Sequence, residues 1–418
     1  MERTHMKAEM LFAEALGIQA PWKIESIEFD SEKKHLDIHV DFVRGSVFSY
    51  QDPETGEEES YKAYDTVEKT WRHLNFFEHV CYIHARVPRI QPKDGGTKMV
   101  SPPWSGRVNG FTLLFEALIL QICTNMPIMK ASRILKTTDH KLWAVLEGYT
   151  EAALKDEDYS EVRTIGIDET SIRKGHNYIT LFVDLVSKRT LFVTEGRDHQ
   201  TVARFAQALE SRNGNRNNIK DVSCDMSPAF IKGVREALPH AEITFDKFHI
   251  LKVINEAVDA VRKEEVKTQP VLKGNRYVFL KNDYNLTAKQ MKAKTALSKL
   301  NLKTVRALRM RVSFQEIYQA TTVDDFKSFL QRWYYWMTHS KLKPMIKAAK
   351  TIKKHWSGVI RWKSSQINNG ILEGLNSVIQ AAKRKARGYK FKHFKVMVHL
   401  LTSKLDFSKL NPYLPTCF

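Results

Sequence analysis

Cysteine is scarce in this chain of 418 residues, which has four, at Cys81, Cys123, Cys224 and Cys417. No two of them have the spacing of a redox pair or of a zinc knuckle. Cys81 with His84 comes nearest to a ligand pair, and a second pair is missing. We therefore expect no disulfide framework and no cysteine-based zinc site.

Long apolar runs are also missing, so the sequence predicts no membrane span and no membrane partner. The first nine residues lack the apolar centre of a signal peptide, which indicates a cytoplasmic protein. Wholesale disorder is excluded, because 43% of the residues are hydrophobic and 11% are aromatic.

Acidic residues are sparse in the C-terminal part. From Lys247 to Phe418 there are 35 Lys and Arg against 10 Asp and Glu, a net charge of +25. The preceding 246 residues carry a net charge of −6. Such asymmetry fits either a solvated basic surface or a face that contacts phosphates, and it favours a nucleic-acid partner.

The N-terminal part, residues 1–105, reads as a small β-rich module. A helix from His5 to Leu16 precedes a hairpin of Trp22–Phe29 and Leu36–Phe42, both of which alternate apolar and polar residues. Residues 46–105 are rich in Pro and Gly, so we expect irregular structure there. Within them, 71–77 is an aromatic stretch typical of a core.

Residues 106–158 have the layout of a helix-turn-helix unit. Helices are expected at 111–123, 127–135 and 140–154, with a tight turn at 136–139 and Asp139 as the N-cap of the third. That third helix carries Lys141, Trp143 and Glu147 rather than a basic stripe. The unit therefore fits both a DNA reader and a plain packing module.

After a polar linker at 155–161, the pattern predicts three strands, at 164–169, 178–186 and 190–194. A helix at 199–211, a strand at 221–225, a helix at 229–238 and a strand at 241–246 follow. This order is typical of a ribonuclease-H-like core, a mixed five-stranded sheet with flanking helices. Its first and fourth strands are neighbours, and here both end in Asp.

The remainder is predicted to be helical and basic. We assign residues 159–250 to the first part of the core, 251–357 to an all-helical insertion, and 358–418 to the last part of the core. That last part includes a helix at 367–387 and another at 394–405.

Three carboxylates form the candidate site. Asp168 and Asp225 end neighbouring strands, and Glu373 is the only acid between Asp325 and Asp406, among 18 Lys and Arg. A surface salt bridge would also account for Glu373. We favour a metal ligand, because the apolar residues around Glu373 suggest a buried carboxylate that needs a partner. Carboxylate oxygens suit two Mg²⁺ or Mn²⁺ ions.

Several spaced motifs resemble the ISL-three (ISL3) family of bacterial insertion-sequence transposases. They are Gly166-Ile-Asp-Glu-Thr170 with 174–178, Cys224-Asp-Met-Ser-Pro-Ala-Phe230, Phe245-Asp-Lys-Phe-His249, and 368–376 with 383–388. The resemblance implies a DDE transposase with Asp168, Asp225 and Glu373 as metal ligands. It would cut its element's terminal inverted repeats and join the 3′-hydroxyls to target DNA. A nucleoid-associated homodimer on DNA is expected, because two DNA ends must be paired.

The resemblance also marks residues near the site. Asp246-x-x-His249 is similar to an element found near the active site of transposases with a helical insertion. His249 would hold the scissile phosphate or lock the strand–helix junction. Near-site or DNA-contacting roles are expected for Lys383, Arg384, Lys385 and Arg387. Glu169 and Asp168 are adjacent, so they cannot both face one pair of metal ions unless the strand has already ended. The resemblance places the ligand at Asp168 and leaves the role of Glu169 open.

One departure concerns the family's N-terminal zinc ribbon, which is built from two cysteine pairs. The corresponding segments, 48–56 and 88–96, contain no cysteine. A thiolate site cannot form there, so we expect a metal-free or reshaped module with no zinc. Alternative interpretations are a domesticated DNA-binding protein without transposition activity, or a ribonuclease-H-like nuclease.

Overall fold

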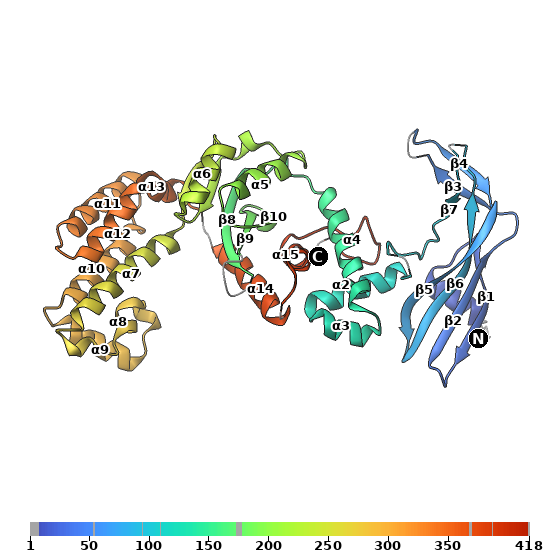
Figure 1. The fold of residues 1–418 in the computed structure, drawn as a ribbon, viewed down its shortest axis with the longest axis horizontal. Helices are drawn as coiled ribbons and strands as arrows, with labels where there is room; N and C mark the ends of the chain where they lie inside the picture. Colours follow the sequence, from blue (N-terminus) through green and yellow to red (C-terminus); the bar gives the residue numbers. More distant parts are fainter. Residues whose placement is uncertain are drawn as a thin grey trace, which may run out of the picture. The chain divides into compact units, whose positions relative to one another are not determined.

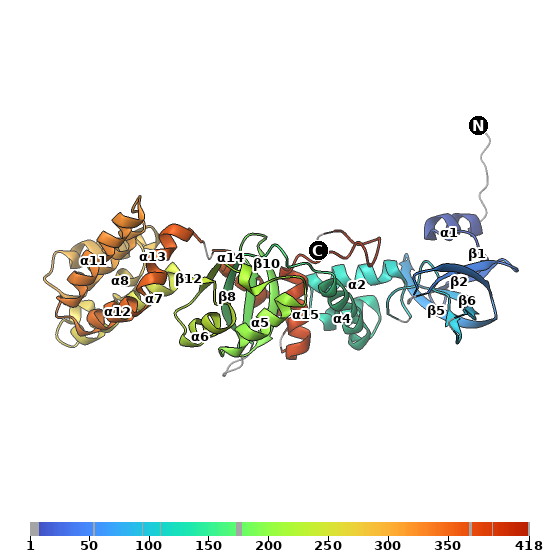
Figure 2. The same cartoon turned by 90° about the horizontal axis from the view of Figure 1, so that it is seen from above.

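The computed structural model describes residues 8–52, 55–93, 95–108, 110–172, 178–367, 370–386 and 388–416. The chain divides into two compact units: Met1–Asp156 with Arg384–Phe418, and Glu157–Lys383. Figures 1 and 2 show the elements of each unit. In the described part of the chain, no helix is long and apolar enough to cross a membrane.

The first unit begins with helix α1 (Ala8–Leu16) and a sheet whose strands run in the order β1-β2-β6-β5, with β7 paired to β6. Their bounds are β1 Trp22–Asp30, β2 His35–Phe42, β5 Asp65–Phe76, β6 His79–Ile90 and β7 Lys98–Met99. Strand β2 is parallel to β6, and the other pairs are antiparallel. Inward side chains such as Trp71, Ile83 and Val87 form its core.

A second, two-stranded sheet in this unit is the hairpin of β3 (Val47–Gln51) and β4 (Glu58–Lys62). The expectation that residues 46–105 are irregular was therefore wrong. Pro and Gly fall mostly in the turns and connections, and the long strands β5 and β6 run between them. Pro88, near the end of β6, still uses its carbonyl to accept from Val100 N at 3.0 Å.

The helix-turn-helix region consists of α2 (Leu113–Asn125), α3 (Ile128–Leu135) and α4 (Asp139–Lys155), and α15 (Phe391–Thr402) packs beside α4. The N-cap of α4 is Thr138, whose hydroxyl accepts from Lys141 N, and not Asp139 as expected. Asp139 instead occupies the first helical position, where its negative charge favours the helix N-terminus.

The second unit contains a five-stranded sheet in the order β10-β9-β8-β11-β12, close to the expected elements. The strands are β8 Thr164–Ser171, β9 Tyr178–Asp184, β10 Arg189–Glu195, β11 Asp221–Cys224 and β12 Glu242–Phe245. Strands β10, β9 and β8 are antiparallel, whereas β11 is parallel to β8 and to β12. Helices α5 (Gln200–Glu210) and α6 (Pro228–Ala237) lie beside the sheet (Figure 1).

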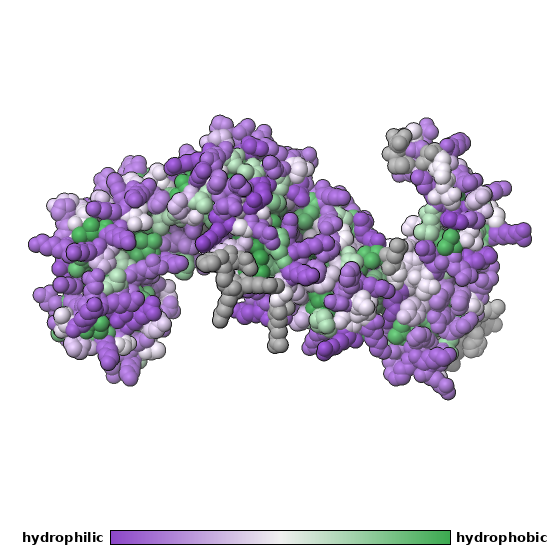
Figure 3. Space-filling view, in the orientation of Figure 1, coloured by the Kyte–Doolittle hydropathy of each residue, from purple (hydrophilic) through white to green (hydrophobic). Residues whose placement is uncertain are grey.

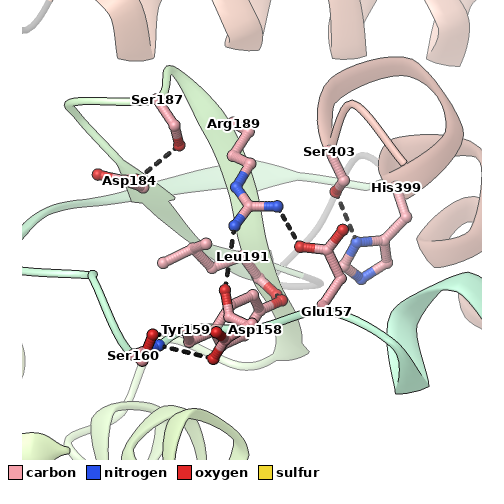
Figure 4. A network of polar contacts seen from close by, with 10 residues as sticks. All are labelled: Glu157, Asp158, Tyr159, Ser160, Asp184, Ser187, Arg189, Leu191, His399 and Ser403. Carbon is pink, nitrogen blue, oxygen red and sulfur yellow. Dashed lines mark hydrogen bonds and ion pairs between the residues drawn. The ribbon is translucent and has the colours of Figure 1, made fainter. Parts of the chain in front are cut away.

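The linker before this sheet is docked on β10 rather than free. Arg189 contacts the Glu157 carboxylate, and the Tyr159 hydroxyl donates to Leu191 O at 2.8 Å (Figure 4). Asp184 accepts from the Ser187 hydroxyl at 2.5 Å in the β9–β10 turn. These polar contacts hold the N-terminal end of the second unit against its sheet.

Helices follow from Lys247: α7 Lys247–Glu265, α8 Arg276–Leu280, α9 Ala288–Ser298, α10 Lys303–Ile317, α11 Val323–Thr338, α12 Lys343–Lys354, α13 Trp356–Ser365 and α14 Gly370–Ala386. Glu265, at the end of α7, links this helix to α10. Its carboxylate accepts hydrogen bonds from Lys303 N and Thr304 N, both at 2.7 Å. On the face seen in Figure 3, most of the surface over α7 to α13 is hydrophilic.

Helix α13 covers the outer strand β12. Gly358 lies so close to it that a Cβ there would be 2.5 Å from the Phe245 ring. Arg361 of the same helix contacts Asp221 of β11 at 2.7 Å and also Glu242 of β12. A sheet edge that would otherwise be open is thus covered by a helix.

Candidate active site

Three aspartates form a row across the parallel strands. Strand β11 pairs with β8 up to Ser223↔Gly166, and with β12 up to Cys224↔Phe245. If this register is continued by one or two residues, Asp225 lies opposite both Asp168 and Asp246. The carboxyl ends of parallel strands meet at one edge of a sheet, which is where such folds place polar sites.

Electrostatic coupling supports this row. Burial, together with the charges of Asp225 and Asp246, raises the pKa of Asp168 to about 6. The backbone N–H of Glu169, which donates to Asp168 Oδ1 at 2.8 Å, and the nearby His249 act in the opposite direction. Asp168 is thus a partly buried carboxylate beside two other acids.

Asp246 and His249 are joined at the start of α7. Asp246 is the N-cap of this helix, accepting from Phe248 N at 2.9 Å, and its other oxygen contacts His249 Nδ1 at 3.1 Å. That hydrogen bond raises the pKa of His249, and the charges of Asp225 and Asp168 raise it too. The imidazole therefore holds the strand–helix junction and also faces the other acids.

Glu169 belongs to a different contact. Its carboxylate lies 3.7 Å from Arg197, whose guanidinium stacks over the Tyr178 ring at 4.3 Å. Asp168 and Glu169 are neighbours within β8. This strand continues to Ser171, whereas the sequence predicted that it ends at Glu169. Since the strand is regular here, the two side chains point to opposite faces.

Helix α14 carries Glu373 and lies against β8 and β9. Its apolar side places Leu372 against Val183 and Leu185. Gly166 makes the close approach possible, because a Cβ at that position would be 2.9 Å from the Leu372 side chain. The glycine before Asp168 thus sets how near the helix can come to the strand.

Polar contacts continue from this packing. Asn376 Nδ2 donates to Asp168 Oδ2, Gln380 Nε2 donates to Thr170 Oγ1, and Lys383 Nζ donates to Ser171 O. These three side chains of α14 therefore contact Asp168 and two later residues of β8, up to the end of the strand. Lys383 already has Ser171 as its hydrogen-bond partner, whereas the side chains of Arg384 and Lys385 are exposed. Arg387 lies outside the described residues.

Glu373 itself is exposed, so the premise that it is buried was wrong. Its apolar neighbours pack against the sheet, while its own side chain lines a cavity of about 1110 Å³ that Asp246 also lines. The described residues give Glu373 no ion pair, which removes the salt-bridge explanation within that part of the chain.

Divalent metal ions suit the chemistry of these side chains, which offer hard carboxylate oxygens in a partly buried setting. The pKa of Asp168 is raised mainly by its burial, and the charges of Asp225 and Asp246 contribute to the increase. No group of three or more His, Cys, Asp or Glu in the described ranges is assembled tightly enough to hold a metal.

Zinc does not fit the N-terminal module. Cys81 and His84 are three residues apart on β6 and so face opposite sides of the sheet; Cys81 is buried, and His84 binds Asp37 at 2.8 Å. Where the ribbon cysteines would be, Lys93 contacts Glu59, and the Tyr61 hydroxyl donates to the same carboxylate. An ion pair and a phenol thus connect hairpin β3–β4 to the segment after β6.

Helix α4 is packed in its middle, and its N-terminal turn is exposed. Trp143 is buried, with the His393 ring stacked on it at 4.0 Å, and Glu147 binds Lys392 at 2.7 Å. His140 and Lys141 are exposed at the N-terminal turn. In helix-turn-helix proteins it is this end of the third helix that contacts bases.

Sequence reasoning missed Gly166, Asn376 and Gln380 as parts of the site. Their signal was present, because Glu373, Asn376, Gln380 and Lys383 repeat at helical spacing on one face of a predicted helix. The pattern could not indicate which strand that face contacts.

Comparisons with known proteins agree with this picture. A family model described as a transposase, of the DDE type in family ISL3, matches residues 165–398. A model described as the helix-turn-helix domain of transposase family ISL3 matches residues 100–150.

Individual relatives are similar over most of their length. The transposase for insertion sequence element IS1001 of Bordetella parapertussis is 25% identical over 340 residues, covering 79% of this chain and 83% of the relative. The transposase for IS1557 of Mycobacterium tuberculosis is 25% identical over 430 residues, covering 95% and 96%. Since the DDE model spans more than half of the chain, this protein belongs to the ISL3 family of insertion-sequence transposases, with a helix-turn-helix domain and a DDE domain.

Proposed function

We propose that this transposase acts on the ends of its own insertion sequence. It binds the terminal inverted repeats, cleaves the DNA there and joins the 3′-hydroxyls to target DNA. The observation that carries the proposal is the row of Asp168, Asp225 and Asp246 at one sheet edge, with the Glu373 helix bonded to the first of them.

In this proposal Asp168, Asp225 and Glu373 hold two Mg²⁺ or Mn²⁺ ions. Their oxygens are of the type such ions prefer, and the crowding of negative charge around Asp168 favours a cation. Bound ions would stabilise the charge that develops on the attacking and leaving oxygens at phosphorus. Asp246 and His249 would keep the start of α7 in place beside the reacting DNA.

We infer a ribonuclease-H-like core formed by residues 159–250 and 358–383, interrupted by the helical insertion 251–357; residues 384–418, which were expected to end the core, belong instead to the first unit. The strand order β10-β9-β8-β11-β12 supports this, as does the return of α14 to β8 after the helices of the insertion. Residues 106–158 would bind the repeats through the exposed start of α4. Two DNA ends call for a homodimer on DNA, with residues 1–105 as a metal-free module.

The test is Mg²⁺-dependent cleavage of a duplex carrying the element's end. We expect Asp168→Asn, Asp225→Asn and Glu373→Gln each to lower the rate by at least a thousandfold while the protein still binds the duplex. Glu236→Gln is the control, since this exposed acid of α6 is paired with Lys232. Wild-type cleavage by any of the three variants would refute the corresponding ligand assignment.

A further inference from the structure

One face of α14 carries Glu373, Asn376, Gln380 and Lys383, separated by three, four and three residues. The last three contact Asp168, Thr170 and Ser171 of β8. Asn376 therefore follows Glu373 by one helical turn and donates a hydrogen bond to the carboxylate of Asp168.

The carboxamide of Asn376 is only half satisfied. Its Nδ2 donates to Asp168 Oδ2, whereas its Oδ1 is buried and has no hydrogen-bond partner among the described residues. A buried acceptor left in this state is unfavourable, so native proteins rarely keep one without a reason.

Oδ1 of Asn376 differs from the other unpartnered buried atoms in the described part of the chain. Trp104 Nε1, Arg189 Nε and Arg361 Nε can only donate a hydrogen bond, whereas His79 Nδ1 and Tyr318 Oη can donate or accept one. An amide oxygen can only accept. Beside an ionised carboxylate, the complement that suits both oxygens is a cation, and amide carbonyls are hard-cation ligands.

We propose that Asn376 Oδ1 is a further oxygen ligand of the divalent ion that Asp168 holds. The inference rests on the proposed function, because it requires the metal site to include Asp168. It adds an uncharged ligand that the DDE set of carboxylates does not contain, placed one helical turn after Glu373. Gln380 on the same face does not share this role, because its partner is the Thr170 hydroxyl.

The test measures Mn²⁺ binding to the full chain without DNA, with free Mn²⁺ counted by electron paramagnetic resonance. Asn376→Ala removes the oxygen and should weaken binding at least tenfold. Asn376→Asp supplies a carboxylate oxygen and should restore binding to wild-type affinity or better. Ser377→Ala is the control, because this side chain of the same helix is exposed, and it should leave the affinity unchanged.

The outcomes separate two roles. If Asn376→Asp weakens binding as much as Asn376→Ala does, the amide acts only through its N–H donation to Asp168, and the ligand proposal is overturned. Unchanged affinity in Asn376→Ala overturns it too. If Asn376→Ala fails to fold, Asn376→Asp tests the proposal alone, because the proposal requires this variant to bind Mn²⁺ with wild-type affinity or better.

Asp168→Asn distinguishes this inference from the function beneath it. If that variant loses Mn²⁺ while Asn376→Ala keeps it, only the inference fails. If Asp168→Asn binds Mn²⁺ like the wild type, the proposed metal site itself fails.

Discussion

At the scale of single residues, the geometry of the candidate site depends on the absence of a side chain at Gly166 as much as on the nearby acids. Leu372 occupies the space that a side chain on Gly166 would need. The helix that bears Glu373 and Asn376 is therefore fixed at a short distance from β8. A small shift of α14 would move both residues relative to Asp168.

We predict that Gly166→Ala lowers cleavage of end DNA by roughly a hundredfold, the effect expected when reacting groups are misplaced by about 1 Å. Overpacking against Leu372 and Leu185 should also lower the free energy of unfolding by about 1–3 kcal/mol. Cleavage rates and urea denaturation measure the two effects.

Gly148→Ala is the control for that variant. It lies within α4, and a Cβ there would have no atom within 4 Å, so stability should be unchanged or higher by up to about 1 kcal/mol. Equal cleavage by the two glycine variants would contradict the proposed role of Gly166.

His73 gives the N-terminal unit a predicted sensitivity to acid. Burial lowers the pKa of His73 to about 4, and the adjacent charge of Arg72 contributes. Because the ordinary value is 6.5, the unfolded chain binds the proton more readily between pH 6.5 and pH 4. Stability should thus fall as the pH drops through this window, by up to about 3 kcal/mol, and be unaffected by this group above it.

Urea denaturation of the first unit's transition at a series of pH values checks this prediction. His73→Gln should make the free energy of unfolding less dependent on pH between pH 6.5 and pH 4. This variant also loses the contact of the imidazole with the Thr112 hydroxyl at 2.9 Å. A variant with the same slope as the wild type would assign the acid sensitivity to other groups.

At the scale of elements, α12 shows how the positive charge is distributed. Lys343, Lys347, Lys350 and Lys354 repeat at helical spacing and are all exposed, while Met345, Ala348, Ala349 and Ile352 are buried on the other side. No ion pair involves these four lysines in the part of the chain that the structure describes. Such a stripe can neutralise successive phosphates of a duplex.

We predict that replacing all four lysines of α12 with Gln weakens binding to a duplex of arbitrary sequence. The slope of log K against log salt concentration should become shallower by about 3 to 4, because each lysine that neutralises a phosphate contributes about 0.9. Binding titrations between 50 and 300 mM salt measure that slope.

The control removes the same charge from four lysines that each already pair with an acid: Lys33, Lys34, Lys232 and Lys327. Their replacement should change the slope by less than about 1, since they are neutralised locally. If both quadruple variants behave alike, net charge and not the α12 stripe determines DNA binding.

At the scale of the whole molecule, the first unit is completed by the end of the chain. Asn411 Nδ2 donates to Leu113 O at 2.8 Å and to the Tyr149 hydroxyl at 2.9 Å, and Tyr149 donates to Glu116 at 2.8 Å. Glu116 also accepts from Val108 N at 2.7 Å, and burial raises its pKa. The helix-turn-helix core thus contains residues nearly 300 positions apart.

Asn411→Ala should lower the free energy of unfolding of the first unit by about 1–3 kcal/mol, because the Leu113 carbonyl loses a buried donor. Hydrogen exchange within α4 should accelerate, and exchange within β8 should not. Ser408→Ala, which removes only a local exposed bond to Asp406, should leave both unchanged. Equal protection of α4 in the two variants would argue against this link.

Local pattern was sufficient for most of the second unit. The strands at 164–169, 178–186, 190–194, 221–225 and 241–246 were predicted within a few residues, because β-branched runs and turn residues encode them directly. The strands within 46–105 were missed, since their Pro and Gly content suggested loops. Thr138 was overlooked as the N-cap because two cap-forming residues are adjacent there.

The sequence by itself determined most elements of the second unit, the charge asymmetry and the family motifs, since each of these is written in local spacing. Only the tertiary structure decided that Asp246 continues the row of Asp168 and Asp225, and that Glu373 is exposed. It also decided which strand the polar face of α14 contacts. The physical reason is that register and helix docking depend on the space around residues such as Gly166, and that space is filled by side chains far away in the chain.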